Sequence, residues 1–204
     1  MLKYYNYDIV FQEIPDEVTL AVNLTGCPVH CPGCHSPHLW EDIGEALDEA
    51  VLRRLYADYA GEVTCICLMG GDADPAAVDR LCAYIKQEMG LRSAWWSGRD
   101  VLPAGEALGH FDYVKTGPYI AARGGLKSPT TNQRLYRIRH SEAPAAGSVP
   151  EDITRRFWKD RLLILFAVSE KLFNFVDATG SAAGRRPVRI KRESGENPGQ
   201  FPLL

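Results

Sequence analysis

The sequence predicts an α/β fold built around a mostly parallel sheet. Apolar, β-prone segments alternate along the chain with segments whose apolar residues recur at helical spacing, which is the pattern of successive βαβ units. The predicted strands also end in turns rich in glycine or cysteine. In parallel α/β folds the loops at the carboxyl ends of the strands carry the functional groups, so we expect the site at that edge of the sheet.

The strands and helices can be placed in order from these patterns. The expected elements are strands at 18–24, 63–69, 91–96 and 111–115, a helix at 48–60, a second helix from Pro75 to Gly90, and a short helix at 103–108. The strand at 63–69 is nearly all apolar, as expected of a parallel strand that is covered on both faces.

The regular alternation ends near Tyr119. Residues 121–132 read as a loop, 133–138 as one more strand, and 141–150 as a linker rich in proline, alanine and serine. An apolar run at 162–168 is followed by a basic, glycine- and proline-rich tail that we expect to be disordered. The sequence therefore predicts one globular domain, of the size of a small enzyme, at 1–160 and a C-terminal extension at 161–204.

Composition excludes several classes of function. The 204 residues carry a net charge of −3, which gives no global reason to expect a nucleic-acid or membrane partner. No segment approaches the roughly 20 apolar residues that span a bilayer, and the first residues lack the apolar core of a secretory signal. Six cysteines in such a chain indicate reduced thiols and a cytoplasmic location.

Three of these cysteines lie in one short loop directly after the first predicted strand. Cys27, Cys31 and Cys34 have the spacing Cys-x₃-Cys-x₂-Cys. A closed structural metal site needs four protein ligands, so three thiolates leave one coordination position open for chemistry. The alternative is a zinc site in which one of three nearby histidines supplies the fourth ligand, and spacing alone leaves it open. These histidines are His30, His35 and His38.

Glycine-rich turns end the next strands. Gly70-Gly71-Asp72 follows the second strand, Ser97-Gly98 the third and Lys115-Thr116-Gly117 the fourth. A Gly-Gly-Asp sequence by itself is typical of a plain turn, and Lys115 alone could equally be a surface residue. The remaining cysteines fall on predicted apolar faces, so we expect them to be small buried hydrophobes. These are Cys65, Cys67 and Cys82.

The cysteine loop resembles the signature of the radical SAM (S-adenosyl-L-methionine) superfamily. The resemblance implies that Cys27, Cys31 and Cys34 hold a [4Fe-4S] cluster whose fourth iron is chelated by S-adenosyl-L-methionine. It also implies that this cofactor is bordered by Gly33, Cys34, His35, Gly70, Gly71 and Asp72. Ser97 and Lys115, by their position at the ends of the next strands, could contact its ribose and its carboxylate. Asp72 stands where the superfamily has Glu, one methylene longer.

Further segments narrow the resemblance to the activating proteins of anaerobic (class III) ribonucleotide reductase. They include Cys31-Pro32-Gly33-Cys34-His35, Lys115-Thr116-Gly117-Pro118-Tyr119 and Thr130-Thr131-Asn132-Gln133-Arg134. The family implies an incomplete (βα) barrel, a flavodoxin-type electron donor, and a glycyl radical formed on the reductase. Two alternatives remain at this point: another small radical SAM enzyme, acting on a different glycyl-radical enzyme or forming a 7-deazaguanine, and a non-catalytic zinc-binding module.

Overall fold

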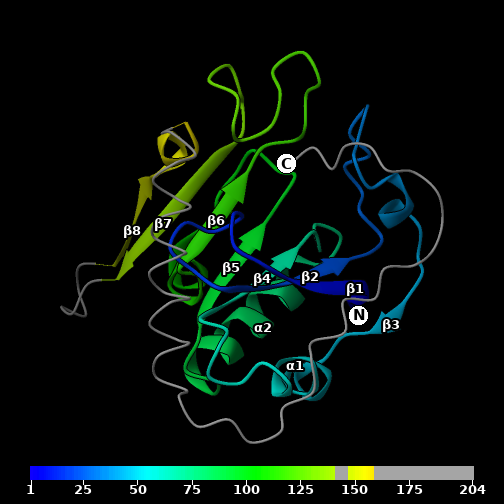
Figure 1. Ribbon diagram of the computed structural model, residues 1–204, viewed down its shortest axis with the longest axis vertical. Coiled ribbons are helices and arrows are strands. Elements are labelled where there is room, and N and C mark those ends of the chain that lie inside the picture. The colour runs from blue at the N-terminus through cyan, green and yellow to red at the C-terminus, as the bar shows by residue number, and fades with distance from the viewer. Residues whose placement is uncertain (141–146, 159–204) are drawn as a thin grey trace, which may run out of the picture. The chain divides into compact units, whose positions relative to one another are not determined.

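The computed structural model describes residues 1–140 and 147–158, which form an eight-stranded mixed sheet with two α-helices (Figure 1). The strand order is β3-β1-β2-β4-β5-β6-β7-β8. The strands are β1 (Lys3–Val10), β2 (Thr19–Leu24), β3 (Glu45–Ala46), β4 (Cys65–Met69), β5 (Arg92–Trp96), β6 (Tyr113–Thr116), β7 (Arg134–His140) and β8 (Ser148–Asp152). The helices are α1 (Glu49–Ala57) and α2 (Pro75–Gln87), with 3₁₀ turns η1 (Pro37–Trp40), η2 (Gly105–His110) and η3 (Thr154–Phe157).

The α/β prediction is confirmed, and its expected strands and helices are found within a few residues of their predicted bounds. The sheet is less parallel than predicted. The pairs β2–β4, β4–β5 and β5–β6 are parallel, whereas the pairs β1–β2, β1–β3, β6–β7 and β7–β8 are antiparallel. The parallel strands form the centre of the sheet, and α1, α2 and the 3₁₀ turn η2 lie in the connections between them.

The antiparallel flanks are where the sequence-based prediction was incomplete. It missed β1, although Lys3–Val10 is rich in tyrosine, isoleucine and valine, which favour strands. It also assigned 141–150 to a linker, yet Ser148–Asp152 forms the edge strand β8. Pro150 lies within β8, and proline is tolerated in an edge strand because one side of it needs no ladder hydrogen bonds.

One face of the sheet, called here the helix face, packs against α1 and α2. Each helix begins at an aspartate whose side chain accepts a backbone hydrogen bond, Asp48 from the Val51 N–H and Asp74 from the Ala77 N–H. Their apolar stripes join the sheet residues in the larger core cluster, and Leu52 and Val78 are completely buried there. This packing fixes the central strands and hence the loops at their carboxyl ends.

The opposite face, called here the loop face, is covered by connecting segments instead of α-helices. Strand register places Cys67, Ala94 and Tyr113 in one row across it. Their exposed fractions are 0%, 0% and 1%, and they cluster with Ile14 and Leu126 from the covering loops. The middle of the loop face is therefore filled by side chains.

The chain divides into two units, Met1–Lys159 and Asp160–Leu204. The expected extension at 161–204, with its apolar run and basic tail, lies outside the described residues and stays a prediction. In the part of the chain that is described, no helix combines the length and the apolar character needed to cross a membrane.

Glu17 ties together the amino ends of the central strands, at the edge opposite the cysteine loop. Its carboxylate accepts hydrogen bonds from the Tyr113 hydroxyl at 3.0 Å and the Thr64 hydroxyl at 2.6 Å, and Arg92 Nε lies 3.0 Å from it. Burial, followed by the charge of Glu17, raises the pKa of Tyr113 to about 12. The network thus holds a charged carboxylate in a buried position, where 8% of the residue is exposed.

Replacing this carboxylate is expected to destabilise the protein. Glu17→Ala leaves the buried Tyr113 hydroxyl without its acceptor, and we expect a loss of about 2–4 kcal/mol in the free energy of unfolding. Denaturant titration measures this loss. Glu151→Ala is the control, because Glu151 pairs with Arg139 at an exposed edge and its removal should cause no measurable change. Equal effects of the two substitutions would contradict the role assigned to Glu17.

Candidate functional site

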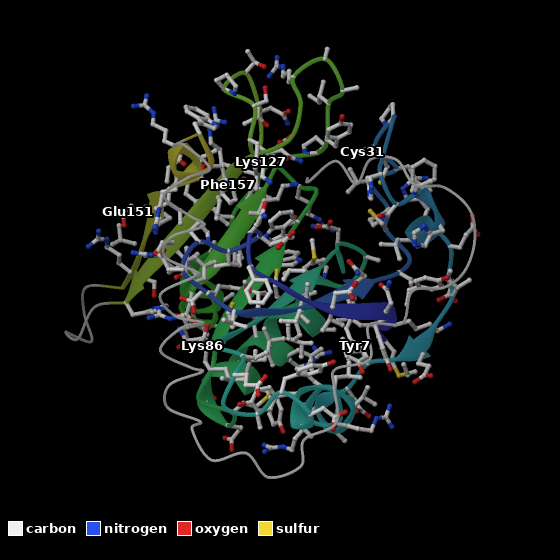
Figure 2. The ribbon with its side chains drawn as sticks, in the orientation of Figure 1. Tyr7, Cys31, Lys86, Lys127, Glu151 and Phe157 are labelled. Atoms are coloured by element: carbon white, nitrogen blue, oxygen red, sulfur yellow. The ribbon has the colours of Figure 1, made fainter. Side chains whose placement is uncertain are left out.

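The cysteine loop begins where β2 ends and is anchored at its base to the segment around η1. The Gly26 N–H donates to the Glu41 carbonyl at 3.0 Å and the Cys27 N–H to the Leu39 carbonyl at 3.1 Å. The imidazole of His30 stacks on the indole of Trp40, with ring centroids 4.8 Å apart. In Figure 1 this loop and the loop after β6 extend toward the same end of the domain, and Figure 2 labels Cys31 there.

Backbone N–H groups point at all three loop sulfurs. The Tyr119 N–H donates to Cys31 Sγ at 3.3 Å, and the Ser36 N–H donates to Cys34 Sγ at 3.4 Å. Burial raises the pKa of Cys27, while hydrogen bonds from the backbone of Val29 and His30 lower it. Such donors stabilise negative charge on sulfur, which is what a thiolate ligand of a cluster carries.

The other three cysteines have a different environment, as their positions in the sequence predicted. Cys65, Cys67 and Cys82 are 0% exposed, and burial raises each of their pKa values well above that of a free thiol. They are protonated, apolar core residues. The loop cysteines are partly exposed, and this difference separates candidate ligands from packing residues.

The Gly70-Gly71 turn is required by both conformation and space. Both glycines have positive φ, +102° and +84°. A Cβ on Gly71 would lie 2.6 Å from Val78 Cγ2 and 2.8 Å from Leu24 Cδ1, both in the packed helix face. The Gly70 carbonyl accepts a hydrogen bond from the Trp95 indole at 2.7 Å. Gly71 can therefore pack against Leu24 and Val78 only because it lacks a side chain.

We expect Gly71→Ala to destabilise the protein by about 3 kcal/mol, from left-handed strain and overpacking together. The matched control is Gly61→Ala, since Gly61 has φ +85° but a Cβ there would meet nothing within 4 Å in the described part of the chain. That substitution should cost only the strain, about 1 kcal/mol. Thermal or denaturant unfolding of the two variants checks the difference, and equal losses would mean that the contacts of Gly71 do not matter.

Asp72 lies within the site, but its carboxylate is already bonded to the protein. It is 1% exposed. Asp72 Oδ1 accepts from the Ser97 hydroxyl at 2.5 Å and Oδ2 from the Gly98 N–H at 2.9 Å. The side chain therefore joins the ends of β4 and β5. Gly98 in turn abuts the cysteine loop, because a Cβ there would lie 2.8 Å from Val29 Cγ2.

Lys115 is buried at the carboxyl end of β6, which excludes the alternative of a surface lysine. Lys115 is 7% exposed, and its ammonium donates to the carbonyls of Gly117 at 2.7 Å and Ser97 at 3.2 Å. Burial lowers the pKa of Lys115 to about 8, against the opposing influence of Cys31 and Asp72. The amine is thus mainly charged at neutral pH and lies within electrostatic reach of the cysteine loop.

This depressed pKa predicts how the stability of the apoprotein depends on pH. An unfolded lysine titrates near 10.5 and folded Lys115 near 8, so between these values the unfolded chain binds the additional proton and stability rises with pH. Relative to Lys115→Met, the wild type should gain about 2–3 kcal/mol of unfolding free energy between about pH 7 and about pH 10. Denaturant titrations of both proteins measure the difference, and a constant difference would contradict the lowered pKa.

Strand register places one predicted site residue, Lys115, in a line of residues on the loop face, called here the carboxyl-end row. Its members lie side by side on successive strands. They are Asn6, Asn23, Met69, Trp96, Lys115 and Leu135. Two buried polar atoms near this row, Trp96 Nε1 and Asn132 Oδ1, have no hydrogen-bond partner within residues 1–140 and 147–158. Unpaired buried polar atoms beside a candidate site suit a ligand that supplies the missing partners.

The predicted site residues do not all converge. Gly33 has φ +76° and faces the ring of Tyr119, so it lies where the cysteine loop meets the segment after β6. His35 is exposed, and its imidazole lies 3.4 Å from the neighbouring Ser36 hydroxyl. In the sequence, Tyr119 stood out only as part of a motif. The hydrogen bond from its backbone N–H to Cys31 was not predicted. No pattern of residue types signals a hydrogen bond donated by a main-chain N–H.

In the described ranges, no group of three or more His, Cys, Asp and Glu side chains is placed to hold a single metal ion. The zinc alternative thus has no preformed ligand cage. The cysteines of a cluster bind different irons and need not converge on one point, so the fit of a cluster depends on the surroundings of each sulfur. Three partly exposed thiols that receive backbone N–H groups, beside a buried cation, suit a negatively charged iron–sulfur cluster.

Comparison with known families supports this assignment. Residues 18–112 match the family model of a 4Fe-4S single cluster domain. The matched range contains β2, the cysteine loop, β4 and β5, and it ends before Lys115. This match supports a 4Fe-4S cluster in this part of the chain and is consistent with an iron–sulfur protein. A search of curated proteins found no match, and a search of solved structures found none either.

Proposed function

We propose that the protein is a radical SAM activating enzyme that uses its [4Fe-4S] cluster to cleave S-adenosyl-L-methionine and form a glycyl radical on anaerobic ribonucleotide reductase. The observation that carries the proposal is the contact between the cysteine loop and the ends of the parallel strands, made by Tyr119 at Cys31 and by Gly98 at Val29. This arrangement suits the incomplete barrel that the sequence resemblance implies, with the reaction at the carboxyl ends of the strands.

The ligand set suits a cluster that binds a cofactor. Cys27, Cys31 and Cys34 would hold three irons, leaving the fourth to S-adenosyl-L-methionine. When bound, the cluster would supply the electron for reductive cleavage of the sulfonium of S-adenosyl-L-methionine, which would make removal of a hydrogen atom from the substrate possible. The electron would come from a flavodoxin-type donor. The protein residues would position the cofactor and exclude water.

Lys115 is the residue best suited to bind the cofactor's carboxylate. Its ammonium has three N–H donors and uses two of them on the carbonyls of Ser97 and Gly117. The third has no partner among the residues described. A buried ammonium with a free donor forms strong charge-assisted hydrogen bonds to a carboxylate. Asp72 would act indirectly, by fixing the ends of β4 and β5, since its own oxygens already accept two hydrogen bonds.

The packing of the loop face favours a protein substrate over a small molecule. Below the carboxyl-end row, Cys67, Ala94 and Tyr113 are buried against Ile14 and Leu126. A small substrate held deep in this face would have to displace packed side chains. The hydrogen to be abstracted would therefore reach the cofactor near the mouth of the site, as the exposed loop of a large partner can do.

An anaerobic reconstitution experiment tests the proposal. The protein is reconstituted with iron and sulfide, its iron and zinc are counted, and it is incubated with S-adenosyl-L-methionine, dithionite and the anaerobic reductase. We expect about four irons per chain, formation of 5′-deoxyadenosine, and the doublet of a glycyl radical in the electron paramagnetic resonance spectrum. One bound zinc without iron would establish the zinc module instead. Cofactor cleavage without the doublet would point to another radical SAM enzyme.

A further inference from the structure

The carboxyl-end row carries two carboxamides at its β1–β2 end. Asn6 on β1 lies directly opposite Asn23 on β2, and Asn23 lies beside Met69 on β4. The same row continues through Trp96 to Lys115, the residue we assign to the cofactor. The two asparagines thus share a face and a level of the sheet with the proposed cofactor site, on the far side of Met69.

These carboxamides retain unused hydrogen-bonding capacity. Asn23 Nδ2 donates to Asn6 Oδ1 at 2.8 Å, and within the described residues neither side chain has another partner. One bond between two carboxamides leaves one carbonyl oxygen and three N–H donors free, whichever way the amides are turned. Asn6 is exposed and Asn23 half-buried. Strand β3 pairs only with Lys3 and Tyr4, so it does not cover β1 at Asn6.

A free carbonyl and a free NH₂ side by side match the donor and acceptor of a peptide group. A glycine offers its partner no side chain, so an enzyme that reacts at a glycine must recognise the main chain around it. We infer that Asn6 and Asn23 bind a main-chain peptide group of the protein substrate next to the reacting glycine. This inference rests on the proposed function, which it deepens by naming the residues that recognise the substrate.

Kinetics with the full-length anaerobic reductase test this inference. The initial rate of glycyl-radical formation, followed by electron paramagnetic resonance, gives KM for the reductase. Asn6→Ala should raise KM about tenfold, because one to two hydrogen bonds are lost, and the Asn6→Ala/Asn23→Ala variant should raise it further. Iron content and the rate of cofactor cleavage without reductase should stay at wild-type values, since neither residue touches the cluster loop in the described contacts.

Three further variants separate recognition from general damage. Gln87→Ala removes an exposed carboxamide at the end of α2 and should leave KM unchanged. Asn6→Asp replaces the NH₂ donor with an acceptor while keeping the size of the side chain, and should resemble Asn6→Ala. Asn6→Gln keeps both groups and should restore much of the affinity, even if alanine variants fold poorly.

The outcomes distinguish this inference from the proposed function. Wild-type protein that activates the reductase, together with a double variant of unchanged KM, would overturn the inference alone. Wild-type protein that forms no glycyl radical would overturn the proposed function and this inference with it. A raised KM accompanied by equally slowed cofactor cleavage without reductase would show damage to the cluster site, and would also overturn the inference.

Discussion

Cys31→Ala is expected to abolish cofactor cleavage, with at least a roughly hundredfold loss of rate, while the apoprotein stays folded. The side chain lies in a partly exposed loop, so its removal takes little from the core. Only two thiolates would remain for the cluster, and the Tyr119 N–H would lose the sulfur to which it donates. Iron analysis, the absorbance of the cluster and the yield of 5′-deoxyadenosine measure the effect, and circular dichroism checks the fold.

Cys82→Ala is the matched control for this substitution. Cys82 lies on α2 within the helix face and is 0% exposed, so its loss should cost about 1 kcal/mol of stability. Iron content and activity should be unchanged. A Cys31→Ala protein that binds the normal amount of iron, or that unfolds globally, would contradict the assignment of the loop to the cluster.

The central part of the fold could be predicted because its sequence signals are local. The apolar strand at Cys65–Met69 and the apolar stripe of α2 show their structure through periodicity alone. The flanks could not be predicted in the same way. β8 is held by antiparallel pairing with the preceding strand β7, and Ser148–Asp152 has little intrinsic preference for a strand.

In the candidate site, too, the features that are local in sequence could be predicted and those that join separate strands could not. The three cysteines are close in sequence, so their spacing predicts a shared ligand without a structure. The bonds from Asp72 to Ser97 and Gly98 join residues about 25 positions apart and exist only because β4 and β5 are neighbours. The pairing of Asn6 with Asn23 likewise depends on β1, a strand that the sequence-based prediction missed. What spans two strands is decided by topology, and residue types alone do not encode it.

Cys31→Ala tests binding of the cluster, and Lys115→Met tests binding of the cofactor. Lys115→Met should leave the cluster in place but weaken cofactor binding. The three thiolates are unaffected, whereas a charge-assisted hydrogen bond worth about 1.5–3 kcal/mol is lost, so Kd for S-adenosyl-L-methionine should rise about 10- to 100-fold. Titration of the reconstituted protein with the cofactor, followed by the change in the cluster spectrum, measures Kd. Iron content serves as the internal control.

Lys86→Met is the matched substitution on the helix face. Lys86 Nζ is also partly buried, 3.0 Å from Asp112, but it belongs to α2 and not to a strand end on the loop face. Its loss should leave Kd for the cofactor unchanged. If Lys115→Met bound the cofactor normally, the free donor of Lys115 would have no part in binding, and the buried charge would have to be explained by its two carbonyl partners alone. Weaker binding in Lys115→Met but not in Lys86→Met would instead tie the cofactor to the end of β6, beyond the range that the 4Fe-4S family model covers.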